Sequence, residues 1–286
     1  MIQKRGVDGF RPGRIFLLAL LLPALIAAAS PSARQKPPSR SSKAAVPLID
    51  VSAQAAKYAH CIRLAKSHPA AGESLATVWR QQGGGHPAWQ CRAVALFGLG
   101  RYREAAQNFD ALAQAMARDP ASLRAGVLDQ AGQAWLMAGD PVRAYADCGA
   151  AAALRPNDPE LLIDEAETAA AASYYQKAIE ALDRVLHQNP KRLDALIYRA
   201  AAYRALNRPA PALADIEQAL AEAPNSLAAR LERGNIRLLA GDIAGAQRDW
   251  LRVAHRSPKS VEGRAARANL AKLARLAGAA EKRSNP

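Results

Sequence analysis

Residues 193–226 read LDALIYRAAAYRALNRPAPALADIEQALAEAPNS, and they contain two markers that recur along the chain at one fixed interval. The first marker is a proline, present at 156, 190, 224 and 258, and the second is an alanine, present at 144, 178, 212 and 246. Neighbouring members of each series are 34 residues apart. Two residue types that keep one interval over four copies indicate an internal repeat of this length.

The repeat has the features of a helical hairpin. Its copies are 86–119, 125–158, 159–192, 193–226 and 227–260. The eighth and twentieth places of each copy hold alanine or glycine, which lets two helices approach closely. The fifteenth place, where the first helix must stop, is occupied by Gly100, Gly139, Ser173, Asn207 and Gly241. Glycine and asparagine tolerate the left-handed backbone that ends a helix, and the proline near the end of the last four copies closes the second helix.

This pattern resembles the tetratricopeptide repeat over residues 86–260. The resemblance implies an all-α fold, a right-handed α-solenoid of about five helix-turn-helix repeats. Residues 48–85 are interpreted as a degenerate N-terminal hairpin divided at Pro69, residues 261–278 as a capping helix, and residues 279–286 as a basic tail. About five extra residues between the first two units should lengthen the second helix or its loop near Asp119 and Pro120. Arginines at 230, 233 and 237 depart from the apolar pattern of the fifth unit, although the stems of arginines can still cover apolar neighbours.

Composition agrees with a helical fold. The 286 residues are 50% hydrophobic but only 5% aromatic, which is too apolar for a wholly disordered chain and poor in the residues that strands favour. Three cysteines without a CxxC pair are too few for a four-cysteine zinc site.

The N-terminus has the layout of an export signal. Four basic residues precede an uncharged apolar run, Ile15–Ala29, which ends in three alanines. We expect residues 1–29 to be a signal peptide cleaved near Ala29, and residues 30–47, rich in serine, proline and basic residues, to be a flexible basic linker. The expected location is the periplasm. An uncleaved anchor in the inner membrane is the alternative, although the run is short for a membrane span.

No catalytic, metal or cofactor site is expected. The five histidines lie far apart, no HExxH or glycine-framed serine occurs, and the Gly-rich stretches at 83–85 and 98–100 lack the GK[ST] ending of a phosphate loop. The sequence therefore predicts that the protein is not an enzyme and needs no cofactor.

The resemblance places the binding surface on the concave groove formed by the first helix of each unit. The polar residues expected to bind a partner there are Asp129, Gln133, Glu160, Asp164, Glu167, Asp194, Tyr198, Glu232 and Asn235. Among all the groove places, six residues are acidic and one, Arg204, is basic, although the whole chain has a formal net charge of +14. The sequence therefore predicts a basic or amphipathic segment as the partner. Acidic residues that serve only solubility are the open alternative.

The predicted function is a non-catalytic periplasmic adaptor or scaffold, which binds a peptide or helix of another cell-envelope protein in its groove. An alternative is a surface-binding module that attaches to anionic membrane or cell-wall polymer through its basic ends. The stretch from Leu251 to Pro286 supports it, because it contains nine basic residues and only two acidic ones. A third reading is the accessory half of an enzyme complex. Nucleic acid is not an expected partner, because the export signal argues against it. The partner's identity and the oligomeric state stay open.

The three cysteines predict one disulfide in an oxidising compartment. Cys148 occupies a place that is apolar in the other units, so it should be a buried thiol. Cys61 and Cys91 would lie on first helices of neighbouring hairpins and could bond. Two separate buried thiols are the alternative.

Overall fold

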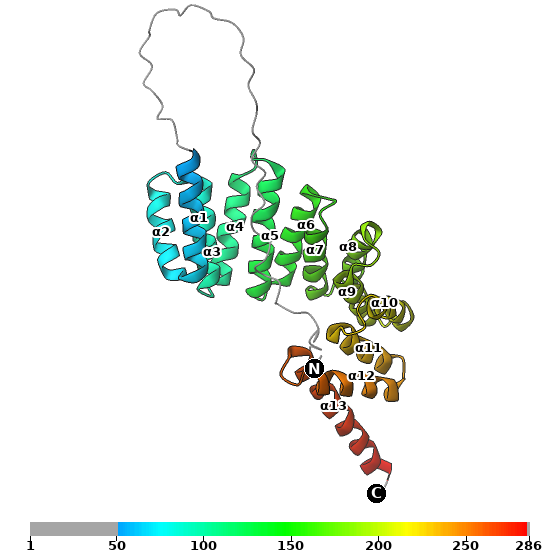
Figure 1. The fold of residues 1–286 in the computed structure, drawn as a ribbon. Coiled ribbons are helices and arrows are strands. Elements are labelled where there is room, and N and C mark those ends of the chain that lie inside the picture. Colours follow the sequence, from blue (N-terminus) through cyan, green and yellow to red (C-terminus); the bar gives the residue numbers. More distant parts are fainter. Residues whose placement is uncertain (1–50, 285–286) are drawn as a thin grey trace, which may run out of the picture.

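The computed structural model describes residues 51–284, which form thirteen α-helices and no strand (Figure 1). The prediction of an all-α repeat solenoid is confirmed. The predicted signal peptide 1–29, the linker 30–47 and the last two residues of the basic tail lie outside the described residues.

Consecutive helices pair into hairpins that stack along the chain, with α1 and α2 at one end and α13 at the other (Figure 1). First helices of successive units also contact each other, as in the series α5, α7, α9 and α11. The elements are α1 Val51–Ser67, α2 Pro69–Gln81, α3 Gly85–Gly98, α4 Tyr102–Ala115, α5 Ala121–Met137, α6 Pro141–Leu154, α7 Pro159–Ala171, α8 Tyr175–Gln188, α9 Leu193–Ala205, α10 Pro209–Glu222, α11 Leu227–Leu239, α12 Ile243–Arg256 and α13 Val261–Ser284.

The turn inside each repeat uses left-handed backbone at its fifteenth place. The φ angle there is positive in all five units: Gly100 74°, Gly139 77°, Ser173 66°, Asn207 58° and Gly241 85°. Ser173 and Asn207 are the non-glycine residues with positive φ among those described. The first helix therefore ends at the same place in every unit.

Close packing within each hairpin depends on a small residue opposite a larger one. The eighth place of a unit faces the twenty-fourth place on its second helix. A Cβ atom added to Gly132 would lie 2.3 Å from the Sγ of Cys148, and one added to Gly234 would lie 2.5 Å from the Nε1 of Trp250. Both partners are buried, with 0% and 1% of their surface exposed. The large side chains thus fill the space that glycine leaves.

Two predictions about element lengths need correction. The extra residues between the first two units do not lengthen α4, which has 14 residues, as does α6. They mainly extend the start of α5, which has 17 residues where α7 has 13. Pro120 precedes α5, and its carbonyl accepts hydrogen bonds from the amides of Leu123 and Arg124, so the helix begins there. At the other end, α13 continues to Ser284, through most of the stretch expected to be a tail.

The arginines that interrupt the apolar pattern of the fifth unit pair with a buried carboxylate. Trp250 and Ile236 are buried in that unit. The guanidinium of Arg233 binds both oxygens of the Asp249 carboxylate, at 2.8 Å from Nε to Oδ2 and 2.7 Å from Nη2 to Oδ1. Arg199 and Asp215 form the same two-bond pair in the fourth unit. An arginine on the first helix can replace an apolar residue because a buried aspartate 16 residues later neutralises it.

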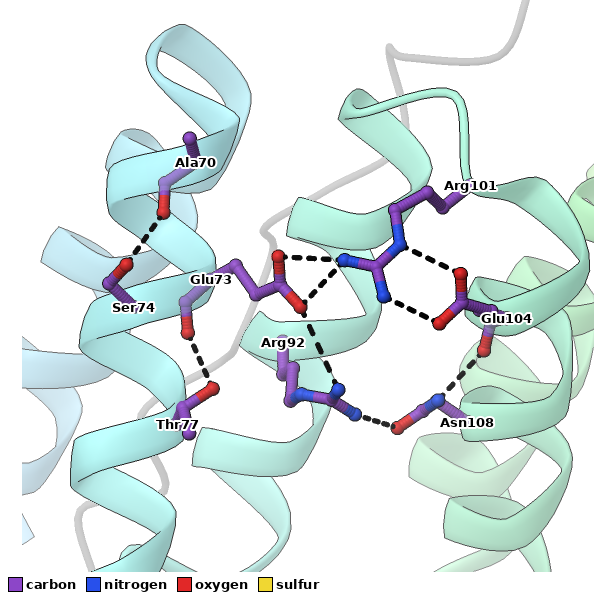
Figure 2. Close-up of polar contacts among 8 residues, drawn as sticks. All are labelled: Ala70, Glu73, Ser74, Thr77, Arg92, Arg101, Glu104 and Asn108. Atoms are coloured by element: carbon purple, nitrogen blue, oxygen red, sulfur yellow. Dashed lines mark hydrogen bonds and ion pairs between the residues drawn. The ribbon is translucent and has the colours of Figure 1, made fainter.

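The N-terminal hairpin is attached to the first repeat by a disulfide and by a polar network. Cys61 of α1 and Cys91 of α3 are bonded, with their Cα atoms 6.0 Å apart. Figure 2 shows Glu73 of α2 facing Arg92 and Arg101, at 3.7 and 3.0 Å between its Oε1 and their nitrogens. Exposed ion pairs stabilise by about 1 kcal/mol or less, whereas closing 30 residues contributes about 3–4 kcal/mol on the chain-entropy model. The disulfide is therefore the stronger link.

The packing of glycine against tryptophan predicts opposite effects for two alanine substitutions. Gly234→Ala should lower the free energy of unfolding by about 1–2 kcal/mol, because overpacking outweighs the gain in helix propensity. Gly126→Ala is the matched control in α5, where an added Cβ meets nothing within 4 Å, and it should raise stability by about 0.5–1 kcal/mol. Urea denaturation of both variants measures this, and equal effects at the two sites would contradict the packing account.

Candidate partner-binding face

The predicted groove residues lie along one row of neighbouring helices. Asp129 and Gln133 are on α5, Glu160, Asp164 and Glu167 on α7, Asp194 and Tyr198 on α9, and Glu232 and Asn235 on α11. Each of these helices contacts the next in the row. Glu232 is buried, with 5% of its surface exposed, and the other eight are half-buried. The row is therefore a continuous face with carboxylates only partly open to solvent.

Asp129 and Asp164 form the centre of this face. Their side chains are hydrogen-bonded to each other across α5 and α7, and the Nε2 of Gln133 donates to Oδ2 of Asp129 at 3.1 Å. Burial raises the pKa of Asp129 to about 6. Burial and the negative charges of Asp129 and Glu167 raise the pKa of Asp164 to about 9. We call these two residues the carboxyl pair; it holds a proton at neutral pH.

Cys148 lies directly beneath the carboxyl pair. Its Sγ is 3.9 Å from Oδ1 of Asp129, and its side chain is fully buried. Burial, followed by the charges of Asp129 and Asp164, raises the pKa of this thiol well above its usual value. Because thiolates rather than thiols are nucleophiles, Cys148 serves packing and not chemistry.

Other acids of the face are neutralised within the chain. Arg192 lies between two of them, with Nη2 2.6 Å from Oε1 of Glu160 and Nε 2.8 Å from Oδ1 of Asp194. Arg204 donates to Oε1 of Glu232. Three of the six acids thus have an arginine partner, and the carboxyl pair is neutralised in part by its bound proton.

The contribution of Arg192 was missed from sequence because this residue precedes α9 and is not one of the family's groove places. The remaining polar residues also have structural contacts. Asn235 donates to Oε2 of Glu232 at 2.9 Å, and its own Oδ1 accepts from Trp250 and from Asn269 of α13. Tyr198 packs against the hydrophobic core. The evenly acidic groove predicted from sequence is therefore narrowed to the segment between α5 and α7.

Within residues 51–284, no three histidine, cysteine, aspartate or glutamate side chains gather as they would around a metal ion. None of the helices in the same range has the length and apolar character needed to cross a membrane.

Comparison with known proteins identifies the fold. No protein-family model matches the sequence, and no curated protein is significantly similar to it. Among solved structures, MamA residues 41 to the end from Desulfovibrio magneticus RS-1 is 20% identical, with a TM-score of 0.53 over 61% of this chain and 97% of that one. A tetratricopeptide repeat protein from Parabacteroides merdae is 18% identical, with a TM-score of 0.52 over 79% of this chain and 78% of the other. The chain has the tetratricopeptide repeat fold.

The carboxyl pair predicts that stability falls as pH rises. Its folded pKa values lie above the ordinary value of 3.8, so the folded state binds more protons than the unfolded state from about pH 4 to about pH 9. Asp164→Asn should flatten this slope, because the amide can still donate to Asp129 without a charge. At pH 8 the variant should be more stable than the wild type by at least about 1.4 kcal/mol, the equivalent of one pKa unit.

Urea denaturation at pH 5 and pH 8 measures the slope, and Asp183→Asn on α8 is the control. Part of the slope should remain in both variants, because burial and the charge of Asp110 also raise the pKa of Asp147 to about 7. A slope that Asp164→Asn leaves unchanged would contradict proton retention by the carboxyl pair.

Proposed function

We propose that this protein is a non-catalytic scaffold that binds a segment of another protein along the face formed by α5, α7 and α9. The observation that carries the proposal is the carboxyl pair, which lies half-buried on this face between α5 and α7 and holds a proton at neutral pH. The tetratricopeptide repeat fold supports this reading because stacked hairpins present a long, preformed surface to extended or helical segments.

The chemistry of the face favours a basic or amphipathic partner. A lysine or arginine close to the carboxyl pair stabilises its ionised form, so partner binding should displace the shared proton. Affinity should consequently rise with pH between about 6 and 9, the range in which the carboxyl pair titrates. A partner segment rich in acids would meet repulsion at the same place.

Two double variants, each lacking two carboxyl groups, test the location of the site. The probe is a fluorescent amphipathic helix with lysines on one face, titrated at pH 7.5. Asp164→Asn with Glu167→Gln should weaken its binding about tenfold, the equivalent of about 1.4 kcal/mol. Glu180→Gln with Asp183→Asn likewise removes two carboxyl groups, from α8, at side chains half exposed to solvent, and should leave binding unchanged. Equal losses in both variants would show general charge attraction, and no loss in either would place the site elsewhere.

We further propose that the protein is exported to the periplasm and that residues 1–29 are removed near Ala29. The basic start and the apolar run that ends in three alanines support cleavage. The Cys61–Cys91 disulfide supports an oxidising compartment, because cytosolic thiols are kept reduced. The alternative attachment to anionic membrane or wall polymer is supported by the excess of bases from Leu251 onward.

One intact-mass measurement tests both export and disulfide formation. Protein recovered from cells is unfolded without reductant, treated with an alkylating reagent and weighed. We expect a chain that begins near Ser30 and carries one label, on Cys148. A chain that begins at Met1 would contradict cleavage, and three labels would contradict the disulfide.

A further inference from the structure

The fifth repeat has arginines where the other repeats have none. At the places of Arg230, Arg237, Arg248 and Arg256, units one to four contain no arginine. Two further arginines, Arg233 and Arg252, bring the fifth unit to six on α11 and α12. This enrichment is a property of one repeat and not of the solenoid as a whole, so the packing that all repeats share does not require it.

The six arginines converge between two helices. Residues 230, 233 and 237 lie on one face of α11, and residues 248, 252 and 256 lie on one face of α12, because residues three or four apart are neighbours on a helix surface. Arg233 and Arg237 of α11 and Arg248 and Arg252 of α12 line one open pocket of about 430 Å³, which Asp249 and Leu251 complete. We call this the arginine pocket.

Positive charge in the arginine pocket is poorly compensated. The single buried carboxylate of Asp249 accepts from Arg233 and from Arg237, each at about 2.8 Å, and Arg230 lies 3.8 Å away. In the fourth unit, by contrast, the single arginine Arg199 forms ion pairs with two carboxylates, those of Asp215 and Asp183.

The residues around the arginine pocket do not neutralise its excess positive charge. Asp242 is 3.8 Å from Arg237, whereas Arg248 and Arg252 pair with no residue of the described chain. Burial lowers the pKa of Arg230, and the charges of Arg252, Arg233 and Arg256 lower it further. Like charges four residues apart also destabilise a helix. Arg230 and Arg256 donate to the Pro224 carbonyl and to Asn225, whereas Arg248 and Arg252 add positive charge to the cluster.

We propose that the arginine pocket is an anion site that binds the phosphate group of a ligand. Guanidinium groups bind phosphate oxygens through two parallel hydrogen bonds, and a phosphate concentrates up to about two negative charges in one compact group. A phosphate therefore relieves more of the repulsion than a single carboxylate does. The ligand is a soluble phosphate compound or a phospholipid headgroup, which share this chemistry. The inference goes beyond the proposed peptide-binding face and does not depend on it.

Two variants with equal charge loss test the arginine pocket. Arg248→Ser with Arg252→Ser removes its exposed arginines and leaves the Asp249 contacts intact. Arg264→Ser with Arg275→Ser removes two exposed arginines from α13 as the control. Circular dichroism should show equal helicity, and melting of the pocket variant should not occur below the wild-type temperature, because repulsion is relieved. The probes are inorganic pyrophosphate, by calorimetry, and phosphatidylglycerol vesicles, by sedimentation.

We expect the pocket variant to lose about tenfold or more in affinity for at least one probe, while the control changes less than about twofold. Loss of pyrophosphate binding would identify soluble phosphate as the ligand source, and loss confined to vesicles would identify a headgroup. Equal losses in the two variants would overturn the proposal in favour of general charge attraction. Absence of binding to both probes would also overturn it.

Discussion

The close approach of the two helices within each hairpin is the constraint on which the rest of the structure depends. A glycine or alanine at the eighth place accepts the larger side chain at the twenty-fourth, as Gly234 accepts Trp250 and Gly132 accepts Cys148. Left-handed backbone at the fifteenth place then reverses the chain at the same point in every unit. Because each hairpin has the same shape, first helices line up beside one another, and their outward residues form one face.

That constraint also explains which parts of the fold the sequence could predict. Small residues, turn residues and helix-ending prolines act locally, so their 34-residue spacing was enough to predict the solenoid. The start of α5 could not be placed equally well from the sequence. A proline such as Pro120 can either end one helix or precede the next, and the five extra residues have no counterpart in the other units. The role of the arginines in the fifth unit could not be predicted for a related reason. Their pairing with Asp249 joins two helices, and an apolar pattern within one helix does not reveal it.

The charge of the polar surfaces was even harder to predict from the sequence, because it too depends on contacts between helices. The sequence predicted six acids and one base along the groove, whereas in the structure Arg192 and Arg204 neutralise three of these acids and the carboxyl pair retains a proton. The two remaining charge concentrations differ in sign and lie in different units, the carboxyl pair between α5 and α7 and the arginine pocket between α11 and α12. Together, the two proposals describe a scaffold with one acidic and one basic site on different helices.

The central claim is that the face of α5, α7 and α9 binds a basic or amphipathic protein segment. Photocrosslinking in intact cells tests it most directly, with the reactive group placed at Gln133 beside the carboxyl pair or at the exposed Gln176 of α8. The account predicts a defined product from position 133, whose crosslinked peptide contains lysines or arginines on one helical face, and little product from position 176. Crosslinking from position 176 alone, or an acidic peptide attached at position 133, would contradict it.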